Sequence, residues 1–191
     1  MEILLDNTAW MGYNIFLSVL GVTFGYLFLY SKTSVYKTLF FILWLLFLPN
    51  TIYLVTDLQH FYEQFLTLEL FSQLILVVQY VIVFTLGVIT YLLGFYPLER
   101  ALSKSRFKKI VSKNFILVLA NYLMAFGVAL GRIERNNSWD IFTDPLKVVS
   151  SSLNLLFSPS ALIYILLFGT FSTLLYFSCR DIFKRKVHLL R

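Results

Sequence analysis

The sequence predicts an all-α fold, a polytopic transmembrane helix bundle with about five spans and one helix on the outer membrane surface. The chain is 59% hydrophobic and only 14% charged, whereas soluble domains carry about 25% charged residues. Its apolar residues gather in five runs that have no charged residue near their centres. Backbone polar groups in hydrocarbon must be bonded within their own segment, so each run should form a helix.

The five runs take up most of the sequence, and we therefore expect a single integral membrane domain over residues 1–191. A spanning helix needs about 20 apolar residues. The third run is long enough to tilt or to extend past the bilayer. Gly21 and Gly25 give the first run the spacing that lets helices approach closely, and we expect this contact within one copy of the chain. The expected spans are residues 9–30, 38–57, 68–95, 115–132 and 160–179.

The distribution of basic residues predicts the orientation. The connector 31–37, the connector 100–113 and the tail from Arg180 carry two, six and five of the 16 Lys and Arg residues. In a five-span arrangement these segments share one side, which the positive-inside rule makes cytoplasmic. We therefore expect the N-terminus outside and the C-terminus in the cytoplasm. The net charge of +6 then reflects topology, and the expected partner is the lipid bilayer, not nucleic acid.

Residues 145–157 form a different kind of helix in this prediction. Pro145 suits a first helical turn, and Leu146, Val149, Leu153 and Leu156 recur at helical spacing. The segment is too short to cross a bilayer. We expect an interfacial helix on the outer surface, and the alternative is a re-entrant segment.

A first polar group closes the second span at its outward end. Pro49 should interrupt the helical hydrogen bonds there. If the helix continues, Asn50, Tyr53, Asp57 and His60 lie on one face, because they are spaced by three, four and three residues. Such a polar stripe in a membrane must face a partner or a wet cavity.

A second polar group follows the fourth span and is expected at the same membrane face. Arg132 lies where the helix dipole favours a cation and can make a bidentate bond to a carboxylate or phosphate. Glu134, Asn137, Trp139 and Asp140 follow it within eight residues. We take these residues as candidate ligand-binding residues, together with Asn50 and Tyr53.

Three roles fit the two groups. In a catalytic site, His60 acts as general acid or base, Asp57 orients it, and Arg132 binds an anionic group. In an ion site, Asp57, His60, Glu134 and Asp140 could hold a divalent metal. In a structural network, Asp57 pairs with Arg132 and fixes geometry without chemistry.

Both polar groups fall within longer motifs that carry a family resemblance. The first motif is Phe47-Leu48-Pro49-Asn50-x-x-Tyr53-Leu54-x-Thr56-Asp57-Leu58-x-His60, and the second joins Gly131-Arg132 to Asn137-Ser138-Trp139-Asp140. With these motifs the chain resembles the domain of unknown function 1361 family of bacterial multi-pass membrane proteins. The resemblance implies a bacterial cell membrane and supplies no activity.

The sequence thus predicts an outward-facing polar site at the membrane surface. The leading hypothesis is transfer or hydrolysis on a lipid-linked or envelope substrate, with an anionic lipid or lipid-linked group as ligand. The alternative is a non-enzymatic ion-binding, ligand-binding or accessory transport protein that contains a structural salt-bridge network. The cofactor is unknown, and a divalent metal is the candidate.

Overall fold

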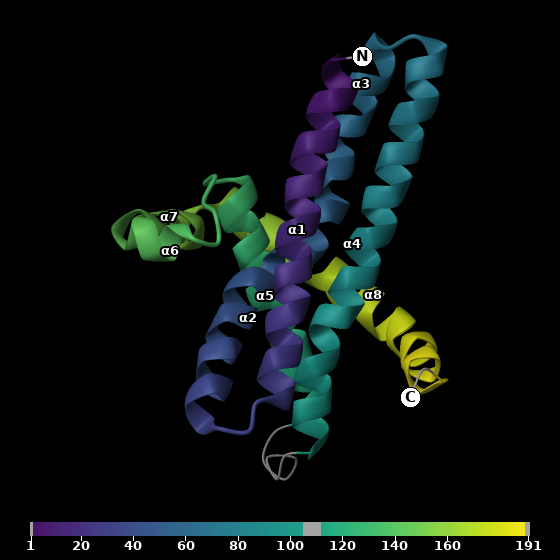
Figure 1. Ribbon diagram of the computed structural model, residues 1–191. Coiled ribbons are helices and arrows are strands. Elements are labelled where there is room, and N and C mark those ends of the chain that lie inside the picture. Colours follow the sequence, from purple (N-terminus) through teal and green to yellow (C-terminus); the bar gives the residue numbers. More distant parts are fainter. Residues whose placement is uncertain (1, 105–111, 190–191) are drawn as a thin grey trace. The chain divides into compact units, whose positions relative to one another are not determined.

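The computed structural model describes residues 2–104 and 112–189, and within these ranges it contains helices and no strand (Figure 1). The basic residues Arg106, Lys108, Lys109 and Arg191 lie outside the described residues. The helices are α1 (Glu2–Tyr30), α2 (Ser34–Thr56), the 3-10 helix η1 (Asp57–His60), α3 (Phe61–Thr67), α4 (Leu70–Lys104), α5 (Lys113–Arg132), α6 (Asp140–Thr143), α7 (Pro145–Phe157) and α8 (Pro159–Leu189).

Five helical segments of the described chain are long and apolar enough to cross a membrane, which confirms the predicted fold class. Several helices extend beyond the spans expected from hydropathy. The first begins at Glu2, and α4 continues through Pro97 to Lys104. A helix can continue past the hydrocarbon wherever its ends find partners, so helix bounds and span bounds need not agree. The spanning segments are Glu2–Tyr30, Ser34–Thr67, Leu70–Ser103, Lys113–Arg132 and Pro159–Phe183.

The helices form two compact units, Met1–Pro97 and Leu98–Arg191, and each is described by itself. In the first unit, the residues through which α1 packs recur every seven positions along the helix. This repeat is expected for two helices that pack nearly in parallel. The N-terminal half of this face contains three polar residues, and its C-terminal half contains two glycines. The repeat consists of Leu4, Asn7, Met11, Asn14, Ser18, Gly21, Gly25 and Phe28, of which Asn14 is half-buried and the others are buried.

The two glycines of this face allow α1 to approach α2 closely. A Cβ atom on Gly21 would lie 2.8 Å from the Phe47 carbonyl oxygen, and one on Gly25 would lie 2.8 Å from a ring carbon of Trp44. These glycines therefore pack within the chain, as expected. The indole of Trp44 is fully buried and donates to the Gly94 carbonyl oxygen over 2.9 Å, which ties α2 to α4.

The second unit contains the end of α4 together with α5, α6, α7 and α8. Its core combines three alanines with two larger aliphatic side chains where α5, α7 and α8 meet: Ala125, Ala129, Ala161, Leu155 and Ile165. Helix α7 has the bounds expected from the sequence. Its cap is Asp144, whose carboxylate accepts from the backbone N–H of Lys147 over 3.1 Å.

Candidate functional site

Asp57 is the buried charged residue of the first polar group. It follows α2 directly and opens η1, and it is 1% exposed. The side-chain amide of Asn14, from α1, donates to its Oδ2 over 3.4 Å. A carboxylate buried at the end of a membrane-spanning helix is expensive to desolvate and is therefore a functional-site candidate by default.

The other members of the first polar group differ in how far their side chains are buried. Asn50 and Tyr53 are half-buried in α2, and the Asn50 amide donates to the Phe47 carbonyl oxygen over 3.2 Å. His60 is exposed at the end of η1, with a ring nitrogen 3.1 Å from the Gln59 side-chain nitrogen. Residues three apart in a 3-10 helix are eclipsed. Asp57 and His60 thus lie on one side of η1, one buried and one exposed, and a bond between them stays a prediction.

A second polar contact in the first unit joins α1, α3 and α4. Asn7 of α1 and Gln64 of α3 bond reciprocally through their amides, over 2.8 and 3.1 Å. The hydroxyl of Tyr80, from α4, donates to the same Gln64 oxygen over 3.1 Å. One of these helices, α3, directly follows the η1 turn that carries Asp57. Asn7 and Asn14 were not selected from the sequence, although two asparagines seven residues apart at the start of the first apolar run fit one helix face.

In the second unit, Arg132 is the last residue of α5, half-buried at the helix end as expected. The loop that follows turns sharply. Arg135 has a positive φ of 53°, and the backbone N–H of Asn136 returns to the Leu130 carbonyl oxygen over 3.0 Å. Glu134 is half-buried on this loop.

Asp140 has a local structural role in this loop. Its carboxylate accepts from the backbone N–H of Asn137 over 2.8 Å and lies 3.5 Å from the Lys147 ammonium. It is 8% exposed, whereas Asn137 is exposed and Trp139 half-buried. These contacts close the turn from Asn137 to Asp140.

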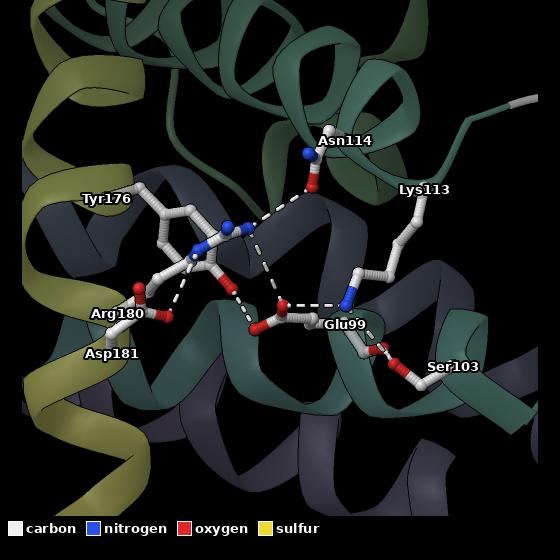
Figure 2. A network of polar contacts seen from close by, with 7 residues as sticks. All are labelled: Glu99, Ser103, Lys113, Asn114, Tyr176, Arg180 and Asp181. Atoms are coloured by element: carbon white, nitrogen blue, oxygen red, sulfur yellow. Dashed lines mark hydrogen bonds and ion pairs between the residues drawn. The ribbon is translucent and has the colours of Figure 1, made fainter.

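The sequence interpretation also missed a buried carboxylate at Glu99, in the last turns of α4. Figure 2 shows side chains of α5 and α8 converging on it. Lys113 places its ammonium 3.0 Å from Oε1, and Arg180 places its guanidinium 3.9 Å from the same oxygen. The Tyr176 hydroxyl donates to Oε2 over 2.7 Å. Glu99 is 3% exposed.

Further contacts extend this Glu99 network at its edges (Figure 2). The Lys113 ammonium also donates to the Ser103 hydroxyl over 3.3 Å. Arg180 donates to the Asn114 side-chain oxygen over 3.1 Å and has Asp181 at 3.4 Å. With two cations and a hydroxyl on one carboxylate, the network joins α4, α5 and α8. The sequence signal for Glu99 was an isolated acidic residue between the third apolar run and the basic segment that follows it.

The described residues contain no group of three or more His, Cys, Asp or Glu side chains that could hold a metal ion. The divalent metal that we considered from the sequence stays a prediction.

These helices and their buried charges define the class of the molecule: a multi-pass α-helical membrane protein with polar clusters at the ends of its spans. The profile of the family described as protein of unknown function (DUF1361) matches residues 13–175. The chain belongs to this family, as the two motifs predicted. No curated protein and no solved structure matches it.

Proposed function

We propose that the chain binds the polar group of a lipid-linked or envelope substrate at an outward-facing site, with Asp57 as the buried acceptor and His60 as the solvent-facing acid or base. The reaction class is transfer or hydrolysis. The location is a bacterial cell membrane, with the N-terminus outside and the C-terminus in the cytoplasm. The burial of Asp57 at the end of a spanning helix is the observation that carries this proposal.

The two side chains are suited to different parts of such a reaction. A carboxylate that is 1% exposed has little water to compete with a bound hydroxyl or ammonium group, and hydrogen bonds to a charged acceptor are the strong ones. The imidazole of His60 is exposed, and an imidazole can act as a general acid or base. A substrate proton can therefore pass between His60 and water while Asp57 holds the polar group.

The position at a span end favours a substrate that is itself partly in the lipid. The charge distribution in the sequence puts the end of α2 outside, where headgroups lie. It puts the end of α5 outside as well, and Arg132 there offers a cation to an anionic group. In the first unit, the amine or hydroxyl of a lipid headgroup would be the donor to Asp57.

A non-enzymatic role is the second candidate, and a specific observation favours it. Asn14 donates to Asp57, and Asn7 and Tyr80 each bond the side chain of Gln64. Polar side chains that satisfy one another's hydrogen bonds in this way can serve helix packing alone. In this alternative, the chain is an accessory or ligand-binding protein whose buried charges fix helix geometry.

Native mass spectrometry of the detergent-purified protein can separate the two. The protein is incubated with a polar lipid extract of bacterial membranes, and the bound lipid is counted for the wild type and for Asp57→Asn. A binding site predicts that Asp57→Asn loses the bound lipid while its melting temperature in detergent stays close to that of the wild type. His60→Ala should retain the lipid, because His60 is assigned to proton transfer.

Glu63→Gln is the matched control, since Glu63 is an exposed carboxylate on the next helical turn. It should bind lipid as the wild type does. If Asp57→Asn keeps its lipid, or if it loses lipid only together with its fold, the packing alternative is correct.

A further inference from the structure

Helix α7 packs against the rest of its unit through a narrow stripe. Leu155 is 0% exposed and Ser151 is also buried, and Leu155 joins the core formed with Ala125, Ala129 and Ala161. Ser151 and Leu155 are four residues apart and lie on one face of the helix. This stripe fixes the rotation of α7 about its own axis.

The fixed rotation leaves a second, wholly apolar face uncovered within the structure. Leu146 and Phe157 are each 82% exposed. The residues between them at helical spacing are exposed as well: Val149, Leu153 and Leu156. Side chains of this size on one continuous face mark a surface that contacts lipid or another protein.

The remaining exposed face is polar. Lys147, Ser150 and Asn154 are all exposed, and their spacing of three and four places them on one side of the helix. Lys147 is oriented by its contact with Asp140 over 3.5 Å. The helix therefore has an apolar edge and a polar edge on either side of its packed stripe.

The connections of α7 determine what covers its apolar edge. Seven residues separate the end of α5 from α6, and the single residue Ser158 separates α7 from α8. Both α5 and α8 are candidate spans, so a helix of 13 residues between them is held at a membrane surface. A helix with one apolar and one charged or polar face lies in the plane of such a surface, with its apolar face roughly 5–10 Å into the headgroup–acyl boundary.

We propose that the face of Leu146, Val149, Leu153, Leu156 and Phe157 is a lipid-binding surface that anchors α7 in the boundary layer of the bilayer. The occupant is the lipid itself, and the polar edge faces water. The charge-based topology is needed only to assign this surface to the outer leaflet. Its consequence is that the turn from Asn137 to Asp140, tied to α7 by Lys147, is held at headgroup depth.

A pair of single-cysteine variants tests this anchoring. Cys179 is first replaced by serine, and Leu153→Cys or Asn154→Cys is introduced and labelled with an environment-sensitive fluorophore. The labelled protein is reconstituted in vesicles of phosphatidylethanolamine and phosphatidylglycerol. Spin labels placed high on the lipid acyl chain or near its end, and aqueous iodide, then serve as quenchers.

The lipid-binding surface predicts opposite behaviour at these adjacent positions. Emission from position 153 should be blue-shifted and quenched most by the shallow spin label, and position 154 should be quenched by iodide. Strong quenching of both by the deep label would show a re-entrant segment, and iodide quenching of both would put the helix in water. Protection of position 153 from all quenchers would show a protein partner. Each of these three results overturns the proposal.

Both positions are exposed, so labelling should leave the packed stripe intact. The adjacent pair Val149→Cys and Ser150→Cys is also exposed on the two edges and must repeat the pattern. Failure of the second pair to repeat it contradicts the assignment of the two faces.

Discussion

The Tyr176 hydroxyl donates to Glu99 Oε2 over 2.7 Å, between two residues 77 apart in the sequence. Both side chains are buried, and the contact joins α8 to the last turns of α4. Hydrogen bonds to charged acceptors are roughly twice as strong as neutral ones. The Glu99 network thus links α4, α5 and α8 through one charged acceptor.

Tyr176→Phe should destabilise the protein while leaving its helices intact. Removing a hydrogen bond to a charged group lowers the free energy of unfolding by about 1.5–3 kcal/mol. SDS titration in mixed micelles, followed by circular dichroism, would measure the change. Tyr62→Phe is the control, because Tyr62 is exposed, and it should unfold as the wild type does. Equal stability of the two variants would show that the Tyr176 bond contributes nothing.

Glu99 and Lys113 should be energetically coupled. Breaking a fully buried ion pair by removing one partner costs about 3–5 kcal/mol, and the effect here should be smaller because the Lys113 side chain is 26% exposed. Glu99→Gln leaves Lys113 and Arg180 without their shared carboxylate, whereas Lys113→Met leaves Glu99 with Arg180 and Tyr176. Glu99→Gln should therefore be the more damaging variant.

A double-mutant cycle in the same SDS titration measures this coupling. The double variant Glu99→Gln/Lys113→Met should lose less stability than the two single variants together. Strict additivity would argue that the 3.0 Å contact contributes no interaction energy.

Gly21→Ala should destabilise the first unit, and Gly12→Ala should not. A Cβ at position 21 would lie 2.8 Å from a backbone oxygen of α2, which cannot move aside cheaply, whereas a Cβ at position 12 has no heavy atom within 4 Å. Overpacking of this kind costs about 1–3 kcal/mol. The measurement is the unfolding free energy of both variants. A larger loss for Gly12→Ala than for Gly21→Ala would contradict the packing of α1 on α2.

The sequence alone was sufficient to predict the five long apolar helices, because hydrocarbon leaves an apolar run of this length little alternative to helix. It also predicted the bounds of α7, since Pro145 marks the start and Pro159 follows the end. The contacts among the helices were harder to predict. Interhelical partners in membranes are single polar residues such as Asn7, Asn14 and Glu99, and their pairing depends on rotations that periodicity does not give.

The candidate site also depends on interhelical packing that the sequence pattern does not give. Spacing predicted that Asp57 and His60 share a face, and both do lie in η1. It could not predict that one is buried and the other exposed, because this follows from packing against α1, including the contact with Asn14. Asp140 was chosen as a ligand residue by type, whereas its contacts with Asn137 and Lys147 give it a role in the turn.

The sidedness of His60 tests the central claim most directly. In a Cys179→Ser background, His60→Cys and Asp57→Cys are treated in intact cells with a membrane-impermeant maleimide. The outward-facing site predicts rapid labelling of His60→Cys, which is exposed, and protection of Asp57→Cys, which is buried. Labelling of His60→Cys only after the cells are permeabilised would contradict an outward-facing site.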